Sequence, residues 1–348
     1  MGGSPRVSVI MAAYNHAPFI GEAIRSVLNQ SFQDFELIIT DDGSTDGTPD
    51  VIRGFADSRI DLEVFPANQG ACEATNRCLE RARGEYIAVI NSDDFFLPGK
   101  LERQVAILDA EPELGVVFGL PHFIDEAGAP MNEENNPFSR VFSSVPTDRF
   151  AWLRHFLLQG NVLCHPTAMV RRRIYDELGN YNVNLRQLPD FDMWVRVCAH
   201  YPIYVVQEPF TAFRVLNGLR NTSAPTPAAV SRGVWEFSRV LRRYWSIDEA
   251  TLQRAFVRDI PPEVAARGLP MWVQLAFLAT TRSGPQLQLF ALETLEEALA
   301  TGVPGLGPKD LHKLSGELDL FRIHKPTKKR LSRRVKTLWH SAMRAFRK

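Results

Sequence analysis

Two adjacent carboxylates end an apolar run in the stretch YIAVINSDDFF, which spans residues 86–96. Like charges side by side repel, so Asp93 and Asp94 need a positive partner. A pair of carboxylates suits a hard divalent cation such as Mg2+ or Mn2+, which completes its shell with phosphate and water oxygens. A helix N-cap is the alternative, because Asp94 comes shortly before a helical pattern that starts at Lys100. The preceding Ser92 and the polar ends of other predicted strands favour the cation.

A second acidic pair, Asp41 and Asp42, opens the stretch DDGSTDGT after another apolar run. A carboxylate here can accept a hydrogen bond from the imide of a nucleotide base or from a ribose hydroxyl. The alternative is a turn cap, because Asp, Ser, Thr and Gly all favour turns. Asn15 allows the same two interpretations, and the stretch that begins at Asn68 (NQG) is also typical of a turn.

A third acidic site lies in LPDFDMW, where Asp190 and Asp192 begin a helical pattern. Acidic residues are favoured in the first turn of any helix, because they interact well with the helix dipole. The functional alternative is that one of them is a general base, which must reach a hydroxyl proton directly or through one water.

The segments around these residues alternate between strand and helix patterns over about the first 125 positions. Apolar runs predict buried strands at 6–15, 35–40, 60–66, 85–91 and 115–120, and periodic stripes predict helices at 19–32, 49–55, 71–83 and 100–111. This alternation predicts a parallel sheet with helices on both faces. Ligands of such sheets bind beyond the carboxyl ends of the strands, where most of the polar residues above would converge.

The remaining chain predicts a long loop over 125–146, then helices at 148–158, 172–178 and 190–201 and a late strand at 203–215. Beyond residue 231 the pattern is helical. We therefore predict three parts: a sheet domain over 1–225, a helical region over 226–322, and a basic tail over 323–348.

The bulk composition is that of a soluble globular protein, with 348 residues, 45% of them hydrophobic and 23% charged. The four cysteines form no CxxC pair, which fits a reducing compartment and disfavours a disulfide scaffold or zinc knuckle. The sequence predicts no signal peptide, and no apolar run approaches the roughly 18 residues of a membrane-spanning helix.

The net charge of zero is unevenly distributed. Residues 325–348 carry ten Lys and Arg and no Asp or Glu, which leaves 30 basic against 40 acidic residues elsewhere. On a helix the apolar residues of this tail share one face, a pattern that suits a helix lying on an anionic membrane surface: Leu331, Val335, Leu338, Trp339, Ala342 and Phe346. A solvated helix against the acidic body and a disordered tail are alternatives. The sequence shows no nucleic-acid-binding fold, so we expect no nucleic-acid partner.

Several stretches resemble the motifs of family 2 glycosyltransferases in order and spacing, over roughly 6–214: VSVIMAAYN, DDGSTDGT, NQG, ATNRCLERARGEYIAVINSDD, HPTAMVRRRIYDELGNYN and PDFDMWVRV. The resemblance implies a GT-A fold, which is Rossmann-like with a mostly parallel sheet flanked by helices. It also implies a hexosyltransferase-type enzyme (EC 2.4) that uses a nucleotide-sugar donor, with a UDP-sugar favoured.

The resemblance assigns roles position by position. Asp94 would hold Mn2+ or Mg2+, Asp93 would lie near the ribose, and Asp190 would be the base that deprotonates an acceptor hydroxyl. That hydroxyl would attack the anomeric carbon in line with the departing nucleoside diphosphate, which gives inversion. The other residues expected to bind the donor are Ala13, Tyr14, Asn15, Asp41, Asp42, Asn68, Asn76, Ser92 and Arg214, with either Asp41 or Asp42 accepting from the base imide.

The chain departs from the family pattern at three places. Pro189 stands where the family often has Glu, and Thr75 where it often has Arg. The sequence FRVL at 213–216 lacks the His of the family's Tyr-Arg-x-His. The residues considered as replacements are Arg214, Asn217 and Arg220.

These departures keep a second hypothesis open, in which the chain is a catalytically silent GT-A module that binds nucleotide-sugar or a partner enzyme. A nucleotidyltransferase is disfavoured because AAYNHAPF is no Gly-rich, basic phosphate loop. For the enzyme we expect a saccharide or lipid-linked acceptor, bound by 125–146 and 159–165, and a role in surface polysaccharide or glycolipid synthesis. The tail would then hold a cytoplasmic, peripheral protein on the inner face of the membrane.

Overall fold

The computed structural model describes residues 4–132, 136, 138, 146–219, 221 and 226–317. The chain divides by packing into two units, Met1–Thr222 with Ser246–Phe256, and Ser223–Trp245 with Val257–Lys348. The three-part division at residues 225 and 322 stays a prediction. The basic tail over 323–348 lies outside the described residues.

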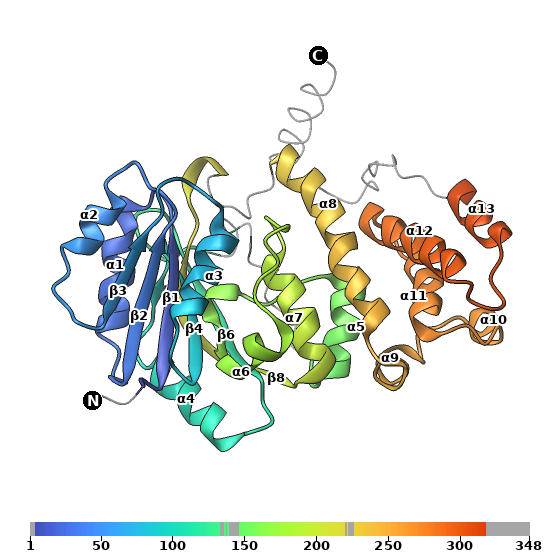
Figure 1. The fold of residues 1–348 in the computed structure, drawn as a ribbon, viewed down its shortest axis with the longest axis horizontal. Coiled ribbons are helices and arrows are strands. Elements are labelled where there is room, and N and C mark those ends of the chain that lie inside the picture. The colour runs from blue at the N-terminus through green and yellow to red at the C-terminus, as the bar shows by residue number, and fades with distance from the viewer. Residues whose placement is uncertain are drawn as a thin grey trace, which may run out of the picture. The chain divides into compact units, whose positions relative to one another are not determined.

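The first unit is built on an eight-stranded mixed sheet with the order β3-β2-β1-β4-β7-β6-β8-β5 (Figure 1). The parallel strands of its first half are β1 (Val7–Ala13), β2 (Phe35–Asp41), β3 (Ile60–Val64) and β4 (Tyr86–Asn91). The second half consists of β5 (Phe95–Phe96), β6 (Val116–Ile124), β7 (Met169–Arg171) and β8 (Ile203–Arg214). Strand β6 pairs parallel with β8, whereas β7 and β5 pair antiparallel with their neighbours.

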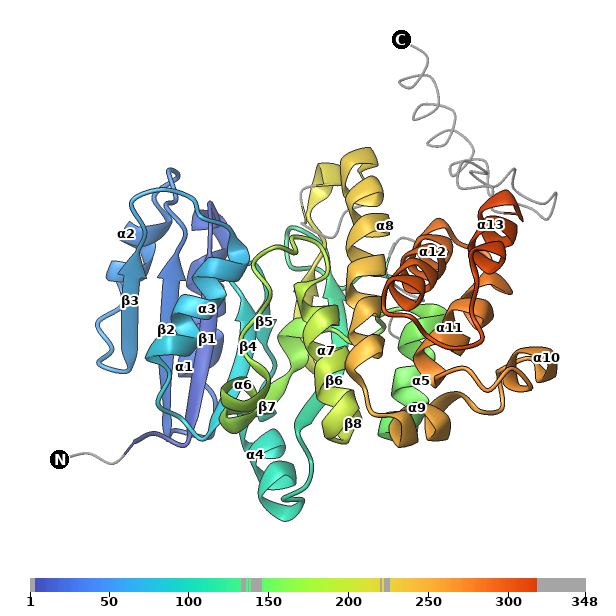
Figure 2. The same ribbon diagram turned by 45° about the vertical axis from the view of Figure 1, so that its right-hand side comes forward.

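From β1 to β6 the helices of this unit alternate with the main strands, as the sequence predicts for about the first 125 residues. They are α1 (Ala17–Leu28), α2 (Thr48–Arg53), α3 (Ala71–Arg81), α4 (Lys100–Ala110), α5 (Arg149–Gln159), α6 (Arg172–Leu178), α7 (Pro189–His200) and α9 (Glu249–Phe256), with 3-10 turns η2 (His165–Thr167) and η3 (Asn217–Leu219). Helices α1 and α4 pack their apolar residues against one face of the parallel strands. Helix α3 covers the opposite face, as turning the view shows (Figure 2). Strands buried on both faces explain the nearly continuous apolar runs of the sequence.

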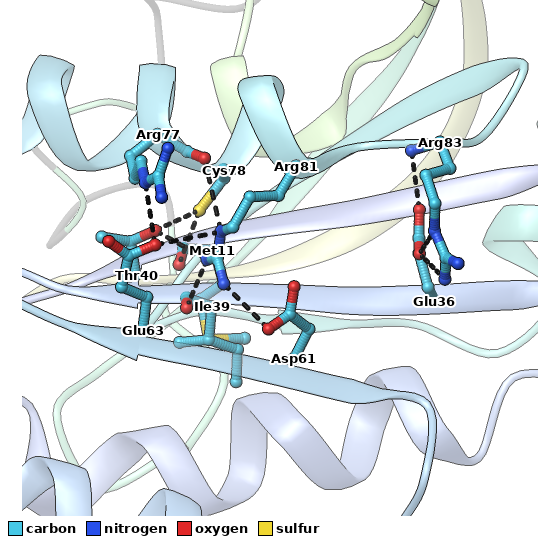
Figure 3. Close-up of polar contacts among 10 residues, drawn as sticks. All are labelled: Met11, Glu36, Ile39, Thr40, Asp61, Glu63, Arg77, Cys78, Arg81 and Arg83. Carbon is cyan, nitrogen blue, oxygen red and sulfur yellow. Dashed lines mark hydrogen bonds and ion pairs between the residues drawn. The ribbon is translucent and has the colours of Figure 1, made fainter.

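Polar contacts hold α3 on the sheet beside strand β2 (Figure 3). Arg81 Nη2 donates to the carbonyl of Ile39 and to Thr40 Oγ1, at 2.8 and 2.9 Å. At the other end of β2 the buried Glu36 accepts from Ser8 Oγ at 2.6 Å and from the guanidinium of Arg83. A buried carboxylate must be paired, and these bonds satisfy that requirement. They fix the strand that leads into the acidic pair at 41–42.

The second unit is helical, with α8 (Pro227–Leu241), α10 (Pro262–Ala265), α11 (Met271–Thr280), α12 (Pro285–Ala300) and α13 (Pro308–Glu317); the 3-10 helix η4 (Arg242–Ser246) leads out of α8. Thr226 caps α8 by accepting from the N–H of Ala229. Glu293 in α12 binds Arg239 and Arg242, which ties α12 to the end of α8. The predicted helical C-terminal region is confirmed. No helix among the described residues has the length and apolar character needed to cross a membrane.

Candidate active site at the carboxyl ends of the strands

Strands β1, β2 and β4 end at the same level of the sheet. Ala13 at the end of β1 pairs in register with Asp41 on one side, and Ala12 pairs with Asn91 on the other. The loops that follow these strands therefore meet at one edge, as the strand pattern predicts. The acidic pair at 93–94 lies in the loop after β4.

The loop after β1 is fixed by its asparagine. Asn15 adopts a positive φ of 52°, a conformation that Asn tolerates better than most residues. Its Oδ1 accepts from the N–H of Thr45 at 2.9 Å, and its own N–H donates to Ser44 Oγ at 2.9 Å. Ala13 is buried, whereas Tyr14 is 43% exposed. The ring of Tyr14 is thus presented beside the strand ends on a rigid turn.

Both carboxylates of the pair at 41–42 accept hydrogen bonds from backbone N–H groups. Asp41 accepts from the N–H and the hydroxyl of Ser44 at 2.8 and 2.6 Å. Asp42 accepts from the N–H groups of Gln69 and Gly70 at 2.6 and 2.9 Å, which positions the loop that presents the exposed Asn68. These contacts are those of carboxylates that cap turns, which was the alternative interpretation of Asp41 and Asp42. Contact of Asp41, Asp42 or Asn68 with a donor stays a prediction.

Asn76 uses both ends of its amide on one distant residue. Its Nδ2 donates to the carbonyl of Tyr181 at 2.9 Å, and its Oδ1 accepts from the N–H of Tyr181 at 3.0 Å. The side chain is buried and joins α3 to the segment before α7. This geometry gives Asn76 a positioning role, and its expected contact with a donor stays a prediction.

The acidic pair at 93–94 is buried, with Asp94 only 2% exposed. Asp94 Oδ1 accepts from the N–H of Arg214 and Oδ2 from Asn91 Nδ2, both at 2.8 Å. Burial raises the pKa of Asp94 well above its usual value, and the neighbouring Asp93 raises it further. Burial also raises the pKa of Asp93, against the opposing charges of His16 and Arg214. A buried pair whose charges are this unfavourable is typical of a functional site.

Arg214 carries a guanidinium beside the pair, yet its side-chain N–H groups bind backbone oxygens and Glu22 and neither carboxylate of the pair. Nε donates to the backbone carbonyl of Asp93 at 2.9 Å, and Nη1 donates to that of Glu126 at 3.0 Å. Nη2 binds the carboxylate of Glu22, and the guanidinium lies over the ring of Phe19 at 5.1 Å. The residue therefore joins α1, the acidic loop and the turn after β6. Its proposed service as a diphosphate ligand stays a prediction, as does that of Asn217. Arg220 lies outside the described residues.

His16 is a residue of this edge that the sequence interpretation missed. Its Nδ1 shares a 2.7 Å hydrogen bond with Ser92 Oγ, next to the acidic pair. Within the described residues Nε2 of His16 makes no hydrogen bond, and this nitrogen is not buried. The partly exposed ring therefore offers Nε2 to solvent. In the sequence, the signal that could have identified His16 is its position directly after Asn15, at the end of the first strand.

The two acids at the start of α7 differ sharply. Asp192 is buried and forms an ion pair with Arg196 one turn later, at 3.0 Å. Asp190 accepts from Asn161 Nδ2 at 2.9 Å, and burial raises its pKa to about 6. A carboxylate with a raised pKa and a hydrogen bond from a neutral amide suits a general base better than one held by a guanidinium. The geometry thus favours Asp190 over Asp192 as the base.

The model of glycosyl transferase family 2 matches residues 8–179. A putative glycosyltransferase of Bacillus subtilis (strain 168), EpsE, is 35% identical over 201 residues, which cover 56% of this chain and 68% of that protein. TuaG of the same organism, a putative teichuronic acid biosynthesis glycosyltransferase, is 29% identical over 242 residues, which cover 69% and 89%. The crystal structure of S. aureus TarS 1–349 in complex with UDP-GlcNAc matches with a TM-score of 0.57 and 17% identity, over 82% of this chain and 83% of that one.

The curled mixed sheet and its flanking helices therefore have the GT-A fold of glycosyltransferases, which confirms the fold that the sequence predicts. The chain belongs to glycosyl transferase family 2. It is a glycosyltransferase, in the transferase class EC 2.4.

Proposed function

We propose that the protein transfers a sugar from a nucleoside-diphosphate sugar to an acceptor hydroxyl, with inversion and with the help of a divalent cation. A UDP-sugar is the donor to be tried first. The proposal rests on one observation above all: two adjacent, buried carboxylates stand at the carboxyl edge of the sheet while the nearby guanidinium of Arg214 is bound to backbone oxygens.

The donor set at this edge fits a hard cation. Asp94 accepts one hydrogen bond on each carboxylate oxygen, and a carboxylate has further lone pairs for coordination. Within the described residues no group of three or more His, Cys, Asp and Glu side chains is placed to hold a metal. A site with one or two carboxylates is the usual arrangement for Mg2+ or Mn2+ that also binds substrate phosphates. When bound, the cation would offset the charge that develops on the leaving diphosphate.

Residues of the chain would divide the remaining work. Tyr14 presents its exposed ring to the nucleotide base, with Ala13 and Asn15 beside it and the carboxylate of Asp93 toward the ribose. His16 would donate from Nε2 to the diphosphate, a role suited to a ring that Ser92 already orients. The loop residues Asp41, Asp42 and Asn68 would complete the side that faces the nucleotide base, and Asn76 in α3 would hold the segment before α7 through Tyr181.

Asp190 would act as the base. It would take the proton of the acceptor hydroxyl as that oxygen bonds to the anomeric carbon and the bond to the diphosphate oxygen breaks. A base with a pKa of about 6 is mostly ionised at neutral pH and still able to accept the proton. Attack from the side opposite the leaving group gives inversion.

The name of one relative suggests a pathway class, and the ligand of one structural neighbour suggests a donor. TuaG is named for teichuronic acid biosynthesis, and TarS was crystallised with UDP-GlcNAc. We therefore propose a saccharide or lipid-linked acceptor in cell-surface polysaccharide or glycolipid synthesis. The basic tail would hold the enzyme on the cytoplasmic face of a membrane, which remains a proposal from sequence alone.

The test is a donor screen. UDP-, GDP- and dTDP-sugars are added with Mn2+ or Mg2+, and the melting temperature is followed, because ligand binding to the folded state stabilises it. The proposal predicts that one nucleotide class raises the melting temperature in a cation-dependent manner and is then hydrolysed or used for transfer. Binding without any turnover would favour the catalytically silent module, and stabilisation by none of the donors would contradict the proposal.

A further inference from the structure

We propose that Asn161 is a positioning residue for the general base: its amide holds the Asp190 carboxylate in one orientation and stabilises its anionic form. This inference rests on the proposed function, because it assumes that Asp190 is the base. Asn161 follows α5 and Asp190 lies in the first turn of α7, so the sequence gives no sign of the contact.

The backbone delivers Asn161 to this place. Helix α5 ends at Gln159 and is followed by Gly160, whose φ of 94° is a conformation that favours glycine. The chain then turns toward the start of α7. Helices α5 and α7 are held together by buried rings, with Phe156 and Phe191 at 5.5 Å between centroids. Phe191 directly follows the proposed base, so the packing of the two helices also fixes the approach of Asn161.

The orientation of the Asn161 amide is determined by its two partners. Its Oδ1 accepts from the backbone N–H of Leu163 at 2.9 Å, so this end must be the oxygen. The other end is therefore the NH2 group, which donates to Asp190 Oδ2 at 2.9 Å. A flipped amide would face the Leu163 N–H with its own donors and the carboxylate with its oxygen. The contact is thus a directed hydrogen bond to an Asp190 oxygen, and such a bond favours the ionised form.

The titratable groups that interact electrostatically with Asp190 are a thiol and a phenol, both neutral near pH 7. Burial raises the pKa of the Cys164 thiol and of the Tyr181 phenol, both of which interact electrostatically with Asp190. His165 shares a hydrogen bond with Tyr181, and burial lowers its pKa to about 4. On α7 itself the charge of Asp192 is paired with Arg196. The hydrogen bond from the Asn161 amide is the side-chain contact that favours the carboxylate anion of Asp190.

The decisive variant is Asn161→Asp, which keeps an oxygen for the Leu163 N–H and replaces the donor by a like charge. We expect the acid limb of the pH profile of kcat/KM to move upward by at least one unit, with donor affinity unchanged. A shift of about two units would lower turnover at pH 7 roughly tenfold, because the base would then be mostly protonated. Asn161→Ala should move the limb in the same direction by less.

The matched control is Asn182→Asp. Asn182 Oδ1 also accepts from a backbone N–H two residues later, that of Asn184 at 3.1 Å, and makes no contact with Asp190. This variant should leave the limb in place. An unshifted limb in both Asn161 variants would overturn the inference while leaving the proposed base intact. Normal turnover of Asp190→Asn would instead overturn the base, and with it the inference.

A second readout covers the case in which Asn161→Asp folds poorly. The melting temperature of a protein is compared with that of its Asp190→Asn derivative over a range of pH. The pH at which the difference changes reports the pKa of Asp190, and no turnover is needed. In the Asn161→Ala background this dependence should move to higher pH. An unchanged dependence would count against the inference.

Discussion

The backbone N–H of Arg214 donates a 2.8 Å hydrogen bond to Asp94 Oδ1, across 120 residues of sequence. The same arginine sends Nε to the carbonyl of Asp93, at 2.9 Å. Arg214, at the end of β8, thereby fixes the acidic loop, while its guanidinium binds neither carboxylate. The pair is held in place but poorly neutralised, so we expect a cation and an anionic donor to bind cooperatively.

Arg214→Ala should destabilise the fold strongly. The side chain is 2% exposed, and its loss would leave buried carbonyl oxygens and the Glu22 carboxylate without their partner. Leaving a buried hydrogen-bond acceptor without its partner costs about 1–3 kcal/mol, and urea unfolding would measure the loss. Arg103→Ala is the control, since Arg103 is exposed and 3.8 Å from Glu208, and it should change the free energy of unfolding by less than about 0.5 kcal/mol. Equal effects of the two variants would contradict the structural role of Arg214.

Turnover should fall as the pH drops through about 6. Burial raises the pKa of Asp190 to about 6, so the base is ionised above this value and protonated below it. Asp190→Asn should keep donor binding and reduce transfer by roughly a hundredfold or more. Donor binding can be followed by calorimetry and transfer by product release. A normal rate in this variant would place the base elsewhere.

The same substitution should not destabilise the protein at neutral pH. A carboxyl whose pKa is raised in the folded state favours folding less once it ionises, so stability from this group is lost as the pH rises through about 6. Asp190→Asn should therefore melt at or above the wild-type temperature at pH 8, with the difference disappearing near pH 4. A lower melting temperature of the variant at pH 8 alone would contradict this assignment of charge and burial.

His16→Asn should separate two roles of the imidazole. An Asn side chain still reaches Ser92, in place of the 2.7 Å contact of Nδ1, but it has no group in the position of Nε2. We expect the melting temperature to hold and the affinity for the bound nucleoside diphosphate to fall about tenfold, with the affinity for the bare nucleoside unchanged. Calorimetry with both ligands in EDTA and in Mg2+ would show this. His200→Asn, at the far end of α7, is the control, and equal loss for nucleoside and diphosphate would argue against a phosphate contact.

The sequence predicts the frame of the site well, because parallel strands buried on both faces leave long apolar runs whose ends are obvious. The strand that precedes Asp93 and the helix that begins beside Asp190 lie where the patterns place them. Short antiparallel strands leave too few residues for a period to appear, so β5 and β7 were not predicted.

The division of labour among the polar residues was not predictable from local pattern. Asp42 and Asn76 bind backbone groups that lie 27 and 105 residues away, and a carboxylate or amide looks the same whether it will bind backbone or ligand. His16 and Asn161 were missed for the same reason, since their importance depends on contacts with Ser92 and Asp190 that only the folded chain reveals.

We propose that Asp94 holds a cation which the donor diphosphate shares. The most direct test of this proposal is the binding of UDP, or of whichever nucleoside diphosphate the donor screen selects, to the wild type and to Asp94→Asn, by calorimetry with and without Mn2+. We expect Mn2+ to strengthen binding to the wild type by at least tenfold and to have no effect on the variant. Equal affinity of both proteins, or an equal response of both to Mn2+, would contradict it.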